Sequence, residues 1–203
     1  MCLGAPYHER VSTWFFDFLA PWYERLTEPL MLIQPAQILS VLQLEGHERI
    51  LDLAGGTGQL ARAIVSSSKA HVTILDASQK MLDQIEPHPR IHPILGVANS
   101  LPFHAETFDW VVCTTAFHLL TPHAATLMAM RRVLKQGGRI FLLDFDRNGL
   151  LGPLLTQSEA LLHLGSHYLS ASEVAEMMKD HGFSGQITPF NLFQFAFVGL
   201  RQD

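Results

Sequence analysis

The stretch ILDLAGGTGQLARAI, residues 50–64, places an apolar strand, a glycine-rich turn and the start of a helix in direct succession. Gly55, Gly56 and Gly58 let the backbone turn tightly and approach a ligand closely, because glycine has no Cβ atom. The first turn of the helix presents free N–H groups, which favour polar or anionic ligands. The stretch therefore predicts a nucleotide-type cradle. A tight strand-to-helix turn without a ligand is the alternative.

The residues around this turn bear on which nucleotide it binds. Gly56 and Gly58, with Ala61 three residues on, loosely satisfy the dinucleotide pattern G-x-G-x-x-G/A, and Asp76 lies about 20 residues further along, as a ribose-binding acid does. That pattern does not require Asp52, a carboxylate inside the first strand. A buried acid there suits a ligand with a cationic amino group. Its alternative role is to accept hydrogen bonds from the N–H groups of the turn.

Strand-like and helix-like apolar runs alternate along the middle of the chain, which is typical of an α/β domain with a mostly parallel sheet. Apolar residues at helical spacing predict helices near residues 60–65, 81–85 and 127–134. Gly137 and Gly138 are expected to end the third of these helices. The expected strands are residues 49–53, 71–75, 91–95, 110–114 and 139–144.

The last part of the chain changes pattern. Residues 150–164 are helix-like, and Ser170 with Glu173 fits a capping box at the start of a helix over residues 171–181. An antiparallel hairpin is expected over residues 184–200, where an alternating apolar run is interrupted near its middle.

We expect a single domain over residues 1–203. Residues 1–45 contain an aromatic-rich helical segment, broken near Pro21, that is predicted to form a cap over the site. The alternative is that its apolar residues at helical spacing, among them Trp14, Phe18 and Trp22, belong to the core. Residues 46–146 form the expected cofactor-binding core, and residues 147–203 supply the C-terminal helices and closing strands.

Composition narrows the class of protein further. The chain of 203 residues has a formal net charge of -5 and no run of Lys or Arg, which argues against a nucleic-acid partner. Its longest uncharged stretches contain proline and polar residues, so no integral membrane segment is expected. Cys2 and Cys113 lie far apart and form neither a disulfide framework nor a CxxC pair. A cytoplasmic location is therefore expected, and the oligomeric state is left open.

Five segments follow one another along the chain in a recognisable order. They are FLAPWYERL (18–26), ILDLAGGTG (50–58), VTILDASQKML (72–82), LPFHAETFDWVV (101–112) and VLKQGGRIFLLDF (133–145). Together they resemble the class I S-adenosylmethionine-dependent methyltransferases, and more narrowly the ubiquinone/menaquinone biosynthesis C-methyltransferases (methyltransferase type 11). The resemblance implies a Rossmann-like α/β fold: a seven-stranded sheet with helices on both faces, an antiparallel C-terminal hairpin and an N-terminal helical cap.

The resemblance also implies the cofactor, S-adenosylmethionine, with S-adenosylhomocysteine as its product. Asp76 would take the ribose hydroxyls, residues 97–98 would flank the adenine, and Thr114 would face the sulfonium. Tyr23 would close over the cofactor from the cap. The implied cofactor-binding residues are Tyr23, Asp52, Ala54, Gly55, Gly56, Thr57, Gly58, Asp76, Ala77, Met81, Val97, Ala98, Asn99 and Thr114.

Two positions depart from the broad pattern of these enzymes. Ala54 replaces the first glycine, as it does in the quinone-type branch. Val97 stands where many relatives place Asp or Asn against the adenine amino group, so one side-chain hydrogen bond is missing.

The methyl acceptor is expected to be a small organic molecule, and the low charge of the chain suits a lipophilic quinol precursor. A lipophilic acceptor of this kind would allow peripheral contact with a membrane. A soluble amine, an acid or a natural-product phenol fits almost as well. A phenol needs a base, and His118, directly after the fourth strand, is the candidate catalytic residue. A structural or solvent-facing histidine is the alternative. The residues expected to contact the acceptor are Trp22, Tyr23, Phe117, His118 and Tyr168.

No metal is expected. His163 and His167 are four residues apart, but Gly165 lies between them and no carboxylate stands at ligand spacing. Two other functions remain open: an NAD-dependent oxidoreductase, and a non-catalytic methyltransferase-like protein that binds S-adenosylmethionine.

Overall fold

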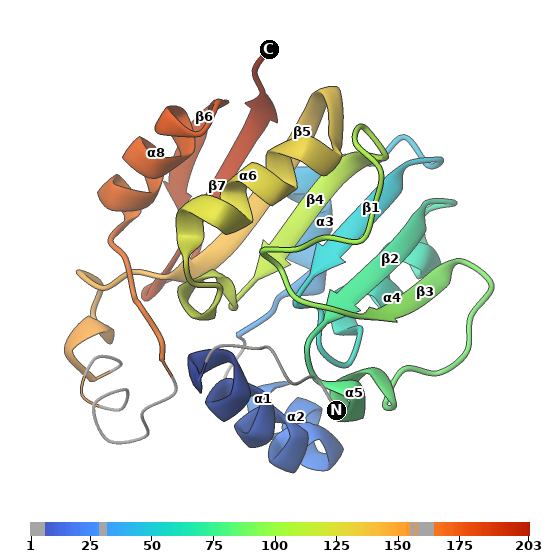
Figure 1. Cartoon of the computed structure of the whole chain (residues 1–203), viewed down its shortest axis with the longest axis horizontal. Helices are drawn as coiled ribbons and strands as arrows, with labels where there is room; N and C mark the ends of the chain where they lie inside the picture. Colours follow the sequence, from blue (N-terminus) through green and yellow to red (C-terminus); the bar gives the residue numbers. More distant parts are fainter. Residues whose placement is uncertain (1–6, 29–31, 155–156, 158–164) are drawn as a thin grey trace.

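The core of the protein is a seven-stranded sheet with strand order β3-β2-β1-β4-β5-β7-β6, seen in Figure 1. The computed structural model describes residues 7–28, 32–154, 157 and 165–203. Strands β1 to β5 pair in parallel, and β7 pairs antiparallel to both β5 and β6. The strands are β1 (Arg49–Leu53), β2 (His71–Asp76), β3 (Ile91–Leu95), β4 (Phe108–Thr114), β5 (Leu134–Phe145), β6 (Phe183–Pro189) and β7 (Gln194–Arg201). This topology confirms the predicted seven-stranded α/β sheet and its antiparallel C-terminal hairpin.

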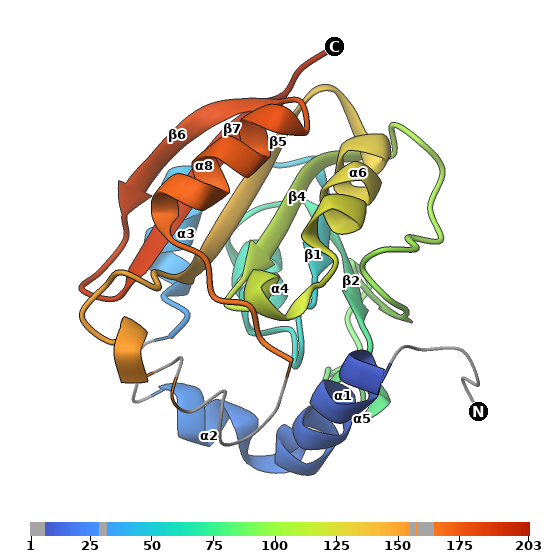
Figure 2. The same ribbon diagram turned by 60° about the vertical axis from the view of Figure 1, so that its left-hand side comes forward.

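Helices cover both faces of the sheet, as the view in Figure 2 shows. Helices α3 (Pro35–Leu42) and α4 (Gln59–Ser67) pack on one face. Helices α6 (His123–Val133) and α8 (Ala171–Asp180) pack on the other. The capping box predicted at the start of α8 is present, with Ser170 and Glu173 bonded reciprocally.

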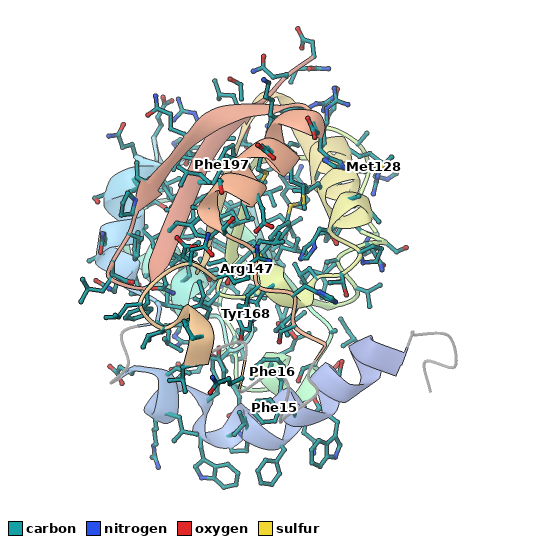
Figure 3. All side chains as sticks on the ribbon, turned by 90° about the vertical axis from the view of Figure 1, so that its left-hand side faces the viewer. Phe15, Phe16, Met128, Arg147, Tyr168 and Phe197 are labelled. Atoms are coloured by element: carbon teal, nitrogen blue, oxygen red, sulfur yellow. The ribbon has the colours of Figure 1, made fainter. Side chains whose placement is uncertain are left out.

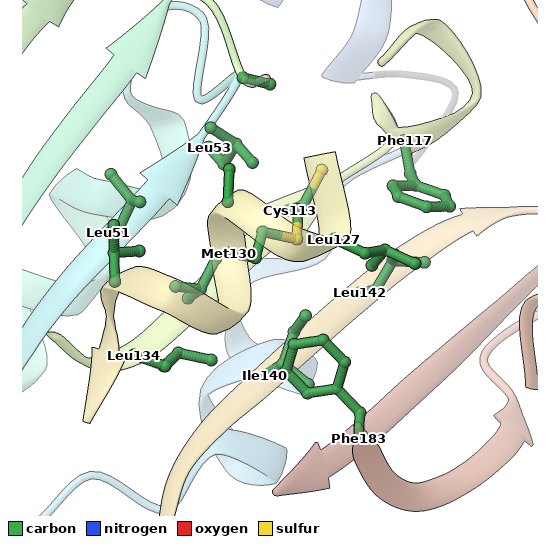
Figure 4. Packing of buried hydrophobic residues seen from close by; sticks show 14 of the residues in the cluster. Leu51, Leu53, Cys113, Phe117, Leu127, Met130, Leu134, Ile140, Leu142 and Phe183 are labelled. Atoms are coloured by element: carbon green, nitrogen blue, oxygen red, sulfur yellow. The ribbon is translucent and has the colours of Figure 1, made fainter. Parts of the chain in front are cut away.

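The alternation of side chains along β4 explains why the sheet needs cover on both sides. Val111 and Cys113 belong to the cluster under α6 and α8, whereas Trp110 and Val112 belong to the cluster under α3 and α4. Figure 4 shows Leu127 of α6 among the buried side chains of the first cluster. A central strand that is apolar on both faces is typical of a parallel sheet.

The boundary between α6 and β5 differs from the prediction. The helix ends at Val133, and β5 begins at Leu134, which pairs with Phe108 of β4. Gly137 and Gly138 therefore lie inside β5, where its register against β4 shifts, and not at the end of a helix. Leu134 is fully buried, and its burial against β4 begins the strand before the glycines.

The N-terminal cap consists of α1 (Tyr7–Leu19), the 3-10 helix η1 (Ala20–Trp22) and α2 (Tyr23–Thr27). The chain changes helix type around Pro21, as predicted. Helix α3 packs instead on the sheet through buried Ile38 and Leu42, so the cap is shorter than the predicted residues 1–45. Most of the helix predicted over residues 150–164 lies outside the described residues.

Candidate functional site

A cavity lies at the carboxyl ends of β1, β2 and β4, with residues of the cap on its opposite wall. This is the edge of an open α/β sheet where ligands usually bind. Most of the residues predicted to bind the cofactor line it: Tyr23, Ala54, Gly56, Asp76, Ala77, Met81, Val97, Ala98, Asn99 and Thr114. These residues come from five separate segments of the sequence and are thus brought together around one space.

The glycine-rich turn after β1 forms one wall of the cavity. A Cβ atom on Gly55 would lie 2.7 Å from the carboxylate of Asp52 and 2.9 Å from Ile74. Gly56 has φ +54° and a Cβ there would meet no atom within 4 Å. Gly55 is therefore required for packing, whereas Gly56 faces open space. Ala54 also has a positive φ, of 56°, which explains why glycine suits this position in related turns.

Asp76, at the end of β2, is held in place by the turn and by the next helix. Its Oδ2 accepts a hydrogen bond from the Gly56 N–H at 2.8 Å, and its Oδ1 accepts one from the Ser78 N–H at 2.8 Å. Burial raises the pKa of Asp76, and these backbone hydrogen bonds oppose that rise by stabilising the charged form. Each carboxylate oxygen can accept a further hydrogen bond, which leaves Asp76 able to bind hydroxyl groups.

Asp52 is a buried acid that has no hydrogen-bond partner among the described residues. Both carboxylate oxygens are inaccessible and unbonded, so the alternative role predicted for it, binding the N–H groups of the turn, is not observed. Burial, with a smaller contribution from the nearby Asp76, raises its pKa to about 7. Asp52 lies against Gly55 and does not itself line the cavity.

We expect Asp52→Asn to make the protein without ligand more stable in alkaline solution. The pKa of Asp52 is 3.8 when the group is solvated and about 7 in the folded protein, so the unfolded chain releases its proton first as the pH rises. Between these values the free energy of unfolding falls by up to about 1.4 kcal/mol per pH unit. Asparagine does not ionise. Thermal unfolding should therefore show the variant's advantage over the parent at about pH 8 and a smaller one at about pH 5. An advantage that does not change with pH would contradict this expectation.

Tyr23 closes the cavity from the cap. It is largely buried, and burial together with the charge of Asp76 raises its pKa to about 12. Its neighbour Glu24 fastens the cap to the core, because it accepts a hydrogen bond from Thr57 Oγ1 at 2.6 Å and pairs with Arg62 at 2.5 Å. Thr57 and Gly58 do not line the cavity, and Trp22 is directed largely to solvent.

His118 lies beside the cavity and not on its wall. Its Nδ1 is 2.7 Å from Asp144 Oδ1, and its backbone N–H donates to Asp144 Oδ2 at 2.7 Å. The imidazole stacks on Tyr168 with ring centroids 4.5 Å apart. Figure 3 shows Tyr168 and Phe16 between the end of the sheet and the cap helices. Phe117, His118 and Tyr168, all predicted to contact the acceptor, are thus adjacent to the lining.

Sequence reasoning missed several lining residues. Thr13 and Phe16 come from α1, Leu75 lies in β2 and Gly96 follows β3. A further group follows β4 or lies in α6: Thr115, Ala116, Leu119, Leu120, Thr121 and Thr126. These are ordinary threonines, alanines and leucines, so no motif identifies them. Ser78 also lines the cavity, and its position as the residue before a helix was the available signal, since it caps α5 (Gln79–Leu82). His163 lies outside the described residues.

Comparison with known proteins places the chain among methyltransferases. The family described as "Methyltransferase domain" matches residues 50–138. The chain is 27% identical over 209 residues to the demethylmenaquinone methyltransferase of Thermotoga maritima, which covers 91% of this chain and 85% of that protein. It is 34% identical over 151 residues to the ubiquinone/menaquinone biosynthesis C-methyltransferase of Syntrophotalea carbinolica, covering 68% of this chain and 64% of that one.

A solved structure shares the fold at low identity. Phosphoethanolamine N-methyltransferase 2 of Haemonchus contortus, in complex with S-adenosylmethionine, superposes with a TM-score of 0.82 and 15% sequence identity. The match covers 98% of this chain and 61% of that chain. At this identity the likeness concerns the fold.

Proposed function

Because the chain belongs to the class I S-adenosylmethionine-dependent methyltransferases, we propose that the cavity holds this cofactor against Gly56 and Asp76 and passes its methyl group to a quinol or phenol. The acceptor binds at the end of the cavity formed by the segment after β4. The observation that carries the cofactor assignment is Asp76, which is partly buried, fixed by two backbone N–H groups and on the cavity wall.

The residues around the cavity fit the parts of this cofactor. Asp76 accepts hydrogen bonds from the ribose hydroxyls, and the apolar side chains of Val97 and Ala98 flank the adenine. The open space at Gly56 lets the backbone approach the methionine part. Asp52 provides a negative charge beneath the turn that attracts the cationic amino group. The bound sulfonium supplies an activated methyl group, and the enzyme has only to align the acceptor with it and exclude water.

The chemistry of the acceptor end favours a neutral aromatic acceptor. The segment after β4 contributes apolar side chains from Ala116, Leu119 and Leu120, and hydroxyls from Thr115, Thr121 and Thr126. Among the described lining residues, Asp76 and Tyr23 are the ionisable ones, and both are assigned to the cofactor. A cationic or phosphorylated acceptor would therefore find no side chain of opposite charge at that end. The Thermotoga relative is named for demethylmenaquinone, whose reduced ring has this character.

His118 stays a prediction as the base that removes a proton from such a ring. With its Nδ1 bound to Asp144, the Nε2 atom is the basic nitrogen. The same hydrogen bonds fix the segment from Ala116 to Leu120, which lines the cavity. Asp144 would act as a positioning residue, because it touches His118 and not the acceptor.

Transfer of a labelled methyl group tests the acceptor class. We expect the purified protein to move label from S-adenosylmethionine to a short-chain demethylmenaquinol under reducing conditions. Phosphoethanolamine and histamine should remain unlabelled, because charged acceptors lack a partner at the cavity's acceptor end. Labelling of an amine in preference to the quinol would contradict the proposed acceptor. Cofactor binding without transfer to any member of a broad phenol and quinol panel would favour the non-catalytic alternative.

A further inference from the structure

The outer face of the cap carries a row of exposed aromatic side chains. Trp14, Phe18, Trp22 and Leu26 follow one another at intervals of four residues, and we call these four residues the aromatic stripe. The exposed fractions of the first three are 69%, 61% and 50%. The rings of Trp14 and Phe18 stack on each other with centroids 6.2 Å apart. Scattered exposed apolar residues are normal, but a continuous row of this kind marks an interaction surface.

Two other segments present exposed leucines at the same end of the molecule. Leu150 and Leu154 follow β5, and Leu192 lies in the turn between β6 and β7. Figures 1 and 2 both place these segments and α2 near the carboxyl ends of the central strands, where the cavity lies. Separate pieces of chain thus expose apolar side chains around one end of the molecule, which suits a broad surface as the partner.

One basic side chain, Arg25, stands within the aromatic stripe, and the acids of the cap are held to its sides. Asp17 accepts a hydrogen bond from Ser78, and Glu24 is bound to Thr57 and Arg62, so both acids have partners in the core domain. Arg25, between Trp22 and Leu26, is exposed and forms no ion pair within the described part of the chain. Of the exposed acids in this region, Glu28 stands beyond the end of the stripe, and Glu86 lines the same surface hollow as Arg25.

The helices that carry the stripe also line the functional site with their inner side. Thr13, Phe16 and Tyr23 contact that space, while Trp14 and Phe18 project away from the core. An α-helix with its side chains is about 10 Å across, so whatever binds the stripe lies about one helix diameter from the cavity.

We propose that the aromatic stripe binds the surface of a phospholipid membrane. Tryptophan suits the boundary between headgroups and acyl chains, because its ring is apolar and its N–H remains hydrogen-bonded. Arg25 beside the stripe attracts anionic headgroups. In residues 7–28, 32–154 and 165–203, no helix combines the length and apolarity needed to cross a bilayer, so the contact is peripheral. The inference rests on the surface and not on the acceptor, although it gives a lipophilic acceptor a short path to the cavity.

Sedimentation with phospholipid vesicles tests this proposal. We expect the protein to bind vesicles of phosphatidylcholine and phosphatidylglycerol, and the double variant Trp14→Gln/Phe18→Gln to bind about 100-fold more weakly, since each large side chain contributes about tenfold when half buried in lipid. Met128→Gln is the matched control, because Met128 is 66% exposed but lies on α6. Arg25→Gln should weaken binding only when anionic lipid is present.

Several outcomes would overturn the proposal: a parent protein that does not sediment with vesicles, or a double variant that binds them as the parent does. Light scattering without lipid provides a further test. A parent that forms a dimer which the double variant abolishes would assign the stripe to a second copy of the chain. Titration of the double variant with S-adenosylhomocysteine in solution should match the parent, so failure of membrane binding is distinguishable from failure of the proposed cofactor site.

Discussion

Asp76→Ala is expected to weaken the binding of S-adenosylhomocysteine by about 100-fold or more. In the proposed site this carboxylate accepts the ribose hydroxyls, and a hydrogen bond to a charged group contributes about 1.5 to 3 kcal/mol. The substitution also leaves the N–H groups of Gly56 and Ser78 without their acceptor. A modest fall in thermal stability should therefore accompany the loss of binding. Calorimetric titration measures the affinity, and thermal unfolding shows that the variant is folded.

Asp83→Ala provides the control for this variant. Asp83 directly follows α5 and is exposed. Its carboxylate accepts a hydrogen bond from the side chain of Gln79 and does not line the cavity. We expect its affinity for the cofactor product to equal that of the parent. An Asp76→Ala protein that is folded and binds as tightly as the parent would show that the ribose site lies elsewhere.

Gly56→Ala and Gly55→Ala should fail in different ways. A methyl group on Gly56 meets no protein atom within 4 Å and enters the space assigned to the cofactor. We expect this variant to lose cofactor binding while it loses only about 1 to 2 kcal/mol of stability, the cost of a left-handed backbone at alanine. A methyl group on Gly55 would lie 2.7 Å from Asp52 and 2.9 Å from Ile74, which strains the core itself.

The two alanine variants are compared by titration and by thermal unfolding together. Gly55→Ala is expected to lower the melting temperature more than Gly56→Ala, because it overpacks a buried contact. If instead Gly56→Ala bound the cofactor normally, the open space beside Gly56 would have another use, and the orientation proposed for the methionine part would be wrong.

The fold was largely predictable because it depends on local apolar patterns. The run at residues 49–53 coincides with β1, since a strand buried on both faces has an unmistakable apolar sequence. The run at residues 91–95 coincides with β3, although this strand lies at the edge of the sheet and is largely exposed. The start of β5 was not predictable in the same way. Leu134 continues the apolar spacing of α6, and only its burial against Phe108 of β4 makes it the first residue of a strand.

The site residues also fall into those that local sequence predicts and those that depend on tertiary packing. Asp76 and the glycines stand in one contiguous pattern with a short spacing, so their proximity follows from a single strand-turn-helix unit and its neighbour. Phe16 and Thr126 line the cavity only because the folded chain brings α1 and α6, which are distant in the sequence, to the same space. The pairing of His118 with Asp144 likewise depends on β4 and β5 being neighbours in the sheet. Contacts of this kind carry no signature in one sequence.

Asp52 is a residue of the proposed site that lowers the stability of the folded protein. An unpaired buried acid destabilises the folded protein once the pH rises above the pKa that the group has in the unfolded chain, and nothing in the described structure compensates for it. In our proposal the compensation comes from the cationic amino group of the bound cofactor. Asp52, which lowers the stability of the protein without ligand, is then explained by its role in binding the cofactor.

Calorimetric titration of the parent protein with S-adenosylhomocysteine, S-adenosylmethionine and NAD tests the central claim most directly. The proposed site predicts one binding site per chain for the first two compounds, with micromolar affinity, and no heat of binding for NAD. Binding of NAD alone would mean that Gly56, Gly58 and Asp76 form a dinucleotide site. Silence toward all three compounds would contradict the assignment of the cavity.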